Sequence, residues 1–175
     1  ILTTVEGGMI FTNKKKYYKE ALIRRNIGEP KNNKYHHVLL GTNARMTEIQ
    51  ASIGIAQLKK LKNFLLRRKK VANKFLKLFK KENLKLNKLK KRGLNYKNSF
   101  FFFPIFINNR DKIAKKLRNK FNIDTRIAYP MPIYDQKLYK DKICKYKKMN
   151  CPNAESFCKK VLNLPMYPSM TDNEI

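Results

Sequence analysis

The sequence predicts an α/β protein in which one unusually long helix joins two regions with different patterns of apolar residues. Apolar residues recur at helical spacing from residue 49 to residue 79, and no proline interrupts them. After Gly93 the pattern changes, and dense aromatic and β-branched runs alternate with amphipathic segments, which is typical of interleaved strands and helices. The 175 residues are enough for one compact domain, or for parts of two.

The region before the long helix is expected to contain a short strand, a surface helix and a loop. The apolar run 9–12 follows Gly7 and Gly8, which indicates a turn that leads into a strand. Residues 14–25 carry tyrosine, alanine and leucine at helical spacing, so we expect a surface helix. Residues 26–40 contain a glycine, a proline and paired asparagines, and their length makes this loop a candidate functional loop.

The long helix has a recognisable start. Thr47 and Gln50 are spaced as a capping box, in which the threonine accepts from the third backbone N–H and the glutamine reaches back. A helix of about 30 residues exceeds the usual globular range of roughly 8–20, and such helices often span two packing units. Gly54 lies inside it, and we interpret it as a small residue that allows close packing.

The second region is predicted to be a small α/β unit. Residues 100–107 form a dense aromatic and β-branched run, hence a strand, and Pro104 inside it suggests a sheet edge. Asp111 can cap a helix whose apolar residues share one face, and 123–129 is predicted as a second strand. The remaining elements are a helix over 153–162 and an extended segment over 164–168.

The net charge of +29 raises the question of nucleic-acid binding. Of the 41 basic residues 32 are lysine and 9 are arginine, whereas base-edge recognition depends on arginine forks. The lysines are also spread along the whole chain, beside 19 asparagines, as a coding bias towards AT-rich codons would produce. We therefore predict a solvated basic surface and no specific nucleic-acid partner, with incidental polyanion binding at low salt.

Neither a membrane span nor a metal site is predicted. No apolar run reaches the roughly 18 residues that a membrane helix needs. Cys144, Cys151 and Cys158 are odd in number, which argues against a disulfide scaffold and fits a reducing, cytoplasmic setting. Their spacing also matches zinc poorly, because His36 and His37 lie far upstream in a loop where we expect them to face solvent.

Four segments, taken in order, carry a resemblance to a known family. They are 1–10 (ILTTVEGGMI), 41–58 (GTNARMTEIQASIGIAQL), 129–139 (YPMPIYDQKLY) and 151–175, which ends LNLPMYPSMTDNEI. Together they resemble the DegT family of pyridoxal-phosphate (PLP) nucleotide-sugar aminotransferases, whose members have the type I aminotransferase fold. Members show Gly-x-Asn-x-Arg-Met before a long helix, and a Tyr-Pro-x-Pro loop further on.

The resemblance implies a domain organisation. Residues 1–78 would be the end of the large PLP-binding domain together with the long inter-domain helix. Residues 79–175 would be the small C-terminal α/β domain, incomplete at its end. The Schiff-base lysine of the family would stand immediately before Ile1, so we expect no catalytic residue in this chain and no activity from it alone.

The resemblance also implies an activity for the parent protein. The family takes an amino group from glutamate and transfers it to a nucleotide-linked keto-sugar for surface polysaccharide or lipopolysaccharide. PLP provides the electron sink, and the lysine moves protons as a general acid and base. The parent would be a cytoplasmic homodimer with shared active sites.

Four residues of this chain are the candidate ligands that the resemblance implies. Asn43 would reach the cofactor phosphate of the partner subunit, since an amide donor ahead of a helix N-terminus suits a phosphate; the alternative is a turn or capping asparagine. Arg45 would steady the phosphate or a substrate anion, or else form a salt bridge with an acidic neighbour. Tyr129 and Tyr134 would face the sugar, although many relatives have histidine at the latter position, and a packed tyrosine is the alternative there.

Two competing functions remain open at this point. A variant of the same family dehydrates the sugar with pyridoxamine phosphate (PMP) and has histidine in place of the lysine. The residue before Ile1 would distinguish the two. The other competitor is a non-catalytic basic interaction module, which predicts salt-sensitive polyanion binding.

Overall fold

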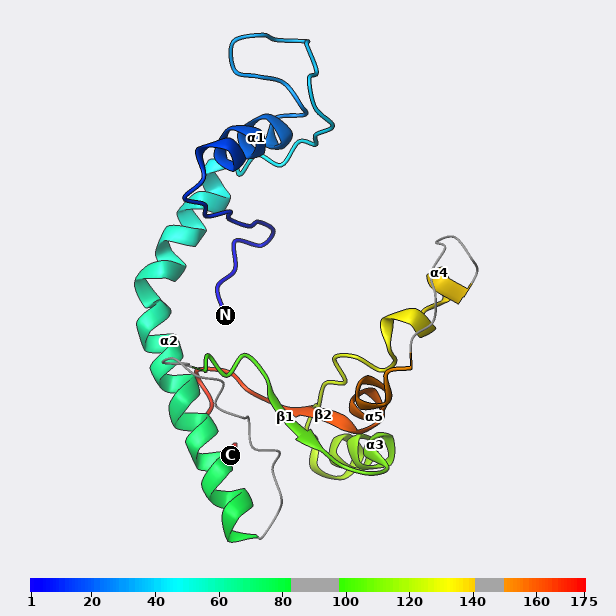
Figure 1. Ribbon diagram of the computed structural model, residues 1–175. Helices are drawn as coiled ribbons and strands as arrows, with labels where there is room; N and C mark the ends of the chain where they lie inside the picture. Colours follow the sequence, from blue (N-terminus) through cyan, green and yellow to red (C-terminus); the bar gives the residue numbers. More distant parts are fainter. Residues whose placement is uncertain (83–97, 141–149) are drawn as a thin grey trace. The chain divides into compact units, whose positions relative to one another are not determined.

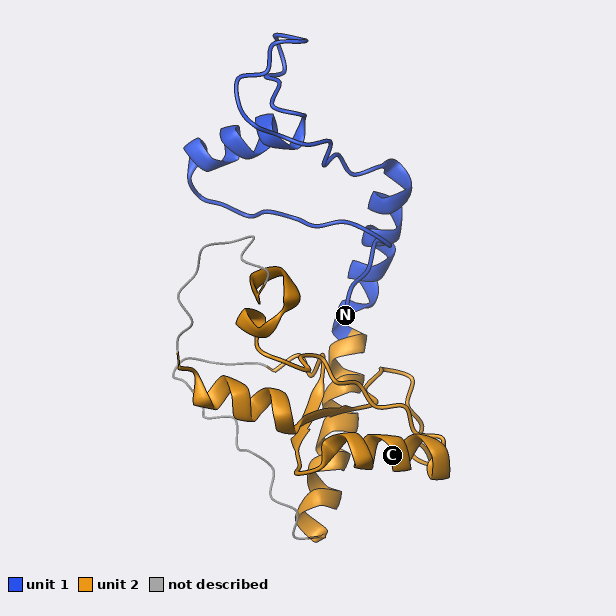
Figure 2. Cartoon of the chain, turned by 90° about the vertical axis from the view of Figure 1, so that its right-hand side faces the viewer, with its two compact units in different colours: residues 1–62 blue, residues 63–175 orange. Residues whose placement is uncertain are grey.

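The structure is a computed structural model that describes residues 1–82, 98–140 and 150–175. The described residues form two compact units, Ile1–Lys62 and Asn63–Ile175 (Figure 2). The boundary falls within helix α2 (Glu48–Lys81), whose 34 residues confirm the long predicted helix. The expected family boundary between residues 78 and 79 concerns the whole protein and stays a prediction.

The first unit contains α1 (Lys15–Arg25), which confirms the helix predicted over 14–25. The strand predicted over 9–12 is wrong, because these residues have no regular secondary structure. A strand needs neighbouring backbone to bond, and among the described residues no segment pairs with this one. Its apolar side chains are consequently exposed, with Phe11 at 85%.

The capping box at the start of α2 is confirmed. The backbone N–H of Thr47 donates to Gln50 Oε1 at 2.9 Å, and that of Gln50 donates to Thr47 Oγ1 at 3.3 Å. The amide of Gln50 also donates to the Glu6 carbonyl at 3.0 Å, which attaches the helix start to the preceding turn. A Cβ at Gly54 would meet Thr4 Cγ2 at 3.1 Å, which supports the interpretation of Gly54 as a close-packing residue.

The second unit is built around a two-stranded antiparallel sheet of β1 (Phe103–Phe106) and β2 (Val161–Leu164) (Figure 1). The register places Pro104 opposite Asn163 and Ile105 opposite Leu162. The strand predicted over 100–107 is therefore present but shorter. Proline is tolerated in β1 because β1 is an edge strand, where the N–H that Pro104 lacks costs at most one bond of a small sheet.

The second strand predicted over 123–129 is wrong. Only a single antiparallel bridge forms, in which Arg126 and Asn163 exchange backbone bonds at 3.0 and 2.9 Å. An extended ladder in this register would place Asp124 opposite Pro165, which has no N–H to donate. The segment is therefore held to β2 at one point instead of along its length.

The helices of the second unit begin and end close to their predicted positions. α3 (Arg110–Phe121) has Asn109 as its N-cap, with φ 54°, so the prediction that Asp111 caps it is wrong. Asp111 lies in the first turn instead, where a carboxylate still favours the positive end of the helix dipole. α5 (Pro152–Lys160) ends before residue 162, because Val161 and Leu162 belong to β2. Two short elements complete the unit, η1 (Ile133–Asp135) and α4 (Lys137–Lys140).

The core of the second unit lies between the later part of α2 and the sheet. Its buried members are Val71, Ala72 and Phe75 from α2, Phe103 and Ile105 from β1, Leu162 from β2, and Met170. The predicted apolar face of α2 is thus buried over its later turns. Over its first turns it is exposed, as Ile49 shows at 75%.

Candidate functional site

The Gly-x-Asn-x-Arg motif is bound to the C-terminal end of α1 by backbone hydrogen bonds. Ile27 N donates to the Thr42 carbonyl at 3.1 Å. In the reverse direction, Thr42 N donates to Arg24 O at 2.9 Å and Ala44 N donates to Arg25 O at 3.0 Å. These bonds satisfy two of the carbonyls that a helix leaves without partners at its end. The motif therefore has a defined position on α1, although it lies in a loop.

Two glycines permit this close approach. Gly28 has φ +85°, and a Cβ there would collide with the Leu39 carbonyl. A Cβ at Gly41 would collide with backbone atoms of Gly28 and Arg24. Since both obstacles are backbone atoms, the loop could not yield by moving a side chain. The loop predicted over 26–40 is thus confirmed and closely packed where it meets the motif.

Asn43 and Arg45 come together in this segment with a third residue, Asn26. Arg45 Nε donates to Asn43 Oδ1 at 2.9 Å, and Arg45 Nη1 donates to Asn26 Oδ1 at 3.3 Å. The backbones of Asn26 and Asn43 also form an antiparallel bridge. All the acceptors of the guanidinium are neutral amide oxygens. Within the described part of the chain, no carboxylate pairs with Arg45, so the salt bridge considered for it is not observed there.

This arrangement leaves donors for an anion. Because the Asn43 oxygen accepts from Arg45, the NH₂ of the same amide is the group that remains to donate. Asn43 and Arg45 are both exposed, and they lie just ahead of the N-terminus of α2. An uncompensated guanidinium, an amide donor and a nearby helix N-terminus are suited to a phosphate group.

The two loop histidines lie near this segment in sequence and are exposed, as expected. His37 Nδ1 lies 3.0 Å from the Ile27 carbonyl, and its Nε2 lies 3.8 Å from Glu29 Oε1. Glu29 also accepts from the backbone N–H of Tyr35 at 2.8 Å. These contacts shape the loop, and they assign no chemistry to His36 or His37.

The two candidate sugar ligands lie in the second unit. Tyr129 is 60% exposed. Tyr134 lies in η1 and donates its hydroxyl to Glu155 Oε1 of α5 at 2.8 Å. Its burial, and then the adjacent carboxylate, raise the pKa of Tyr134 to about 12, so the hydroxyl stays a donor at physiological pH. Its observed partner is therefore a protein carboxylate, and its contact with a sugar stays a prediction.

Comparison with known proteins identifies the family. The model of the DegT/DnrJ/EryC1/StrS aminotransferase family matches residues 1–175. The chain belongs to this family. The resemblance of the four sequence segments is thereby confirmed, and so is the fold class, an α/β part of a type I PLP-dependent transferase.

Relatives within the DegT family include a GDP-perosamine synthase from Escherichia coli O157:H7. It is 29% identical over 177 residues, which cover 99% of this chain and 46% of that protein. The chain thus spans about half the length of the curated relatives it matches.

Solved structures of similar fold include a DegT/DnrJ/EryC1/StrS aminotransferase from Brucella abortus, with a TM-score of 0.79 and 24% identity over 94% of this chain and 42% of that one. Another is NtdA from Bacillus subtilis with bound PMP, with a TM-score of 0.76 and 27% identity, covering 93% of this chain and 38% of that one.

Two arginines of this DegT-family chain are buried, which the sequence reasoning missed. Arg68 is 8% exposed, and its Nη1 donates to the carbonyls of Phe100, Phe101 and Met166 at 2.9, 3.3 and 3.0 Å. Burial lowers its pKa from the usual value. Arg110 is 6% exposed and donates to carbonyls at the junction of α5 and β2. The sequence did indicate the burial of Arg68, because this residue lies one turn before Val71 and Ala72 on the apolar face of α2.

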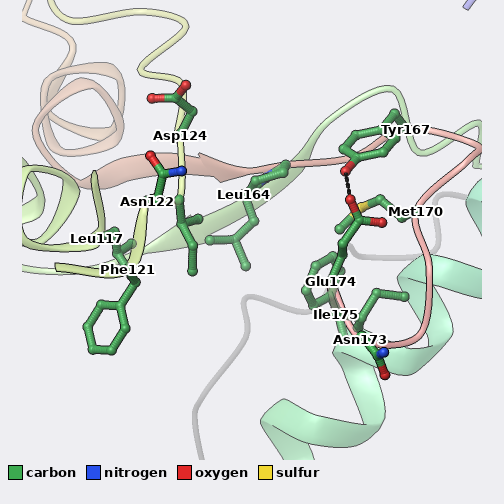
Figure 3. A pocket seen from close by; sticks show the side chains of 13 residues that line it. Leu117, Phe121, Asn122, Asp124, Leu164, Tyr167, Met170, Asn173, Glu174 and Ile175 are labelled. Carbon is green, nitrogen blue, oxygen red and sulfur yellow. Dashed lines mark hydrogen bonds between the residues drawn. The ribbon is translucent and has the colours of Figure 1, made fainter. Parts of the chain in front are cut away.

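A cavity of about 550 Å³ lies in the second unit (Figure 3). Apolar side chains from α2, α3 and β2 line it, together with the segment that ends at Ile175. Tyr167 donates its hydroxyl to Glu174 Oε1 at 2.8 Å (Figure 3). The Glu174 carboxylate also accepts from the backbone N–H of Thr171 at 2.7 Å. These bonds stabilise the wall of the cavity, and they leave it mainly apolar.

Neither a metal cluster nor a membrane helix is found in the described ranges. No three His, Cys, Asp or Glu side chains there are grouped as metal ligands. Cys151 and Cys158 are free thiols at the start and inside of α5, whereas Cys144 lies outside the described residues. No helix in this part of the chain is long and apolar enough to cross a bilayer.

Proposed function

We propose that the protein to which this chain belongs is a PLP-dependent aminotransferase. It transfers the amino group of glutamate to the keto carbon of a nucleotide-linked sugar for surface polysaccharide. The observation that carries the proposal is the exposed Asn43–Arg45 pair, whose cation is held by neutral oxygens and has no carboxylate partner in the described residues. Membership of an aminotransferase family, and a relative named for GDP-perosamine synthesis, support the reaction and the substrate class.

The residues of the first unit fit the phosphate of the cofactor. Asn43 would donate its amide N–H to the phosphate, and Arg45 would supply a full positive charge beside it. The capped N-terminus of α2 adds a favourable dipole. When bound, the cofactor supplies the electron sink for amino transfer. The residues of this chain therefore bind and orient the phosphate, and the proton transfers of the reaction belong to the catalytic lysine of the family.

The proposal includes a homodimer in which Asn43 and Arg45 serve the cofactor of the partner subunit. The first unit supports this with several large apolar side chains that are exposed, among them Ile10 at 78%, Phe11 at 85%, Leu40 at 89% and Ile49 at 75%. Apolar side chains exposed in this number usually contact another part of the same protein or a partner.

The test uses the full-length protein. With glutamate and a 4-keto or 3-keto sugar nucleotide, nuclear magnetic resonance should show an amino sugar nucleotide and 2-oxoglutarate in equal amounts. Arg45→Ala should weaken PLP binding about 10- to 100-fold, since a charge-assisted bond contributes about 1.5–3 kcal/mol. The matched control is Arg67→Ala, which removes another exposed arginine, on α2, and should leave the affinity unchanged.

Other outcomes of the same experiment would replace the proposal. Loss of a sugar hydroxyl without uptake of nitrogen would identify the dehydratase. Absence of PLP binding, combined with polyanion binding that disappears with salt, would identify a basic interaction module.

Shared sites can be tested by mixing subunits. Asn43→Ala subunits, at a PLP concentration too low to fill their weakened site, and subunits without the catalytic lysine should each have little activity. Mixed dimers should regain activity, because one of their two sites then has both residues intact. Failure of every mixture to regain activity, with mixed dimers shown by mass spectrometry, would place Asn43 in the site of its own subunit.

A further inference from the structure

Asn26 lies where the elements of the candidate phosphate site meet. It is the C-cap of α1, and its backbone forms the bridge with Asn43. Its Oδ1 accepts from Arg45 Nη1 at 3.3 Å, and its Nδ2 donates to the Glu29 carbonyl at 3.4 Å. Asn26 is half-buried, whereas Asn43 and Arg45 are exposed. One residue therefore connects the helix, the loop and the arginine.

We infer that Asn26 is a positioning residue for Arg45, orienting the guanidinium for a phosphate ligand without neutralising its charge. The inference rests on the proposed phosphate-binding function of Asn43 and Arg45. It adds a third residue to the site and a reason why that residue is an amide.

The first argument is geometric. Arg45 is bonded through Nε to Asn43 and through Nη1 to Asn26, and two bonds on different nitrogens fix the plane of a guanidinium. The bond from Asn26 Nδ2 to Glu29 determines which end of the Asn26 amide faces Arg45, namely the oxygen. Arg45 Nη2 has no protein partner among the described residues, so it is the donor that remains for a ligand.

The second argument concerns charge. An aspartate has the same shape as asparagine, but it would pair with the guanidinium and would repel a phosphate dianion. A neutral oxygen orients the arginine and leaves its charge available to the ligand. The two asparagines thus orient the guanidinium and leave its positive charge available to an anion, whereas two carboxylates would neutralise that charge.

The experiment measures the affinity of the full-length protein for PLP and for pyridoxal, which lacks the phosphate. Asn26→Ala should weaken PLP binding about 5-fold, as expected for one hydrogen bond. Asn26→Asp should weaken it about 30-fold, because the introduced carboxylate opposes the anion. Neither variant should change the affinity for pyridoxal by more than about 2-fold.

The matched control is Asn33→Ala. Asn33 lies in the same loop, is exposed, and makes no side-chain bond within the described ranges, so its removal should leave both affinities unchanged. If Asn26→Ala does not fold, Asn26→Asp keeps the side-chain shape and still tests the inference. In an Arg45→Ala background, Asn26→Ala should cost less than about 2-fold, because the two residues act on one contact.

Three results would overturn the inference, and they separate it from the proposed function. If Arg45→Ala weakens PLP binding but neither Asn26 variant does, Asn26 has no part in the site and the proposed function stands. If the Asn26 variants weaken PLP and pyridoxal equally, Asn26 maintains the fold and does not act through the phosphate. If Arg45→Ala itself leaves PLP affinity unchanged, the phosphate contact and the inference fail together.

Discussion

The two compact units of this chain differ in what stabilises them. All the buried hydrophobic residues in the described ranges belong to the second unit, where Phe75, Phe103 and Leu162 form the centre of the core. In the first unit the one buried residue is Gly28. Backbone bonds between the motif and α1, and the capping box of α2, define the structure there instead.

The residues that form the hydrophobic core and the residues of the candidate phosphate site therefore lie in different units. Among the residues described in the unit with the core, no exposed arginine is held by side-chain amides, and the unit with the candidate phosphate site has almost no core. Polar groups at a binding site must keep donors open, which conflicts with burying them. Helix α2 belongs to both units and shows both behaviours along its length: Ile49 is 75% exposed and Ala72 is 0% exposed.

The largest expected effect is in the core of the second unit. Leu162→Ala should lower the free energy of unfolding by about 2–5 kcal/mol, since it opens a cavity where the side chain is 0% exposed. Leu76→Ala, on α2 but 42% exposed, is the control and should cost less than about 1 kcal/mol. Urea unfolding of the full-length protein would measure both. Equal costs would show that the described core is not where the stability lies.

A smaller loss is expected from Arg68→Ala. Removal of this guanidinium deprives the carbonyls of Phe100, Phe101 and Met166 of their donor, and should cost about 2–3 kcal/mol. Arg67→Ala, at the exposed neighbour, should be nearly neutral, and calorimetric melting of the full-length protein would measure both variants. If the two variants melt alike, the buried bonds of Arg68 contribute nothing net to stability.

Gly41→Ala tests the first unit. The added Cβ meets backbone atoms of Gly28 and Arg24, so we expect a loss of about 1–2 kcal/mol and PLP binding about 10-fold weaker. Gly8→Ala is the matched control, because a Cβ there meets nothing within 4 Å. A Gly41→Ala protein with unchanged PLP affinity would contradict the dependence of the site on this close approach.

The smallest effect is expected from Tyr134→Phe, which removes the bond to Glu155 and should lower the melting temperature by about 2 °C. The folded-state pKa of Tyr134, about 12, lies above the usual value of 10. The protonated hydroxyl thus stabilises the fold below about pH 10, and this contribution is lost as the pH rises to about 12. Stability of the natural protein should therefore fall more steeply over this interval than that of the variant. Parallel curves would argue against the raised pKa.

Several elements could be predicted from the sequence because their signals are local. The capping box of Thr47 and Gln50, the long helix and the aromatic strand before Ile107 depend on residues close together in the chain. The predicted strands over 9–12 and 123–129 were wrong, because a strand exists only through a partner. The first has none among the described residues, and the second meets Pro165 after a single bridge.

The candidate site likewise has features that the sequence determines and features that only the fold determines. The sequence by itself determined the family, the Gly-x-Asn-x-Arg motif and the choice of Asn43 and Arg45, because these are chemical identities at fixed spacing. Only the tertiary structure decided that Arg45 is held by amides and not by a carboxylate, and that Asn26, 19 residues earlier, belongs to the same cluster. The physical reason is that hydrogen bonds depend on distance in space. The sequence does not determine the distance between two residues that a loop of this length separates.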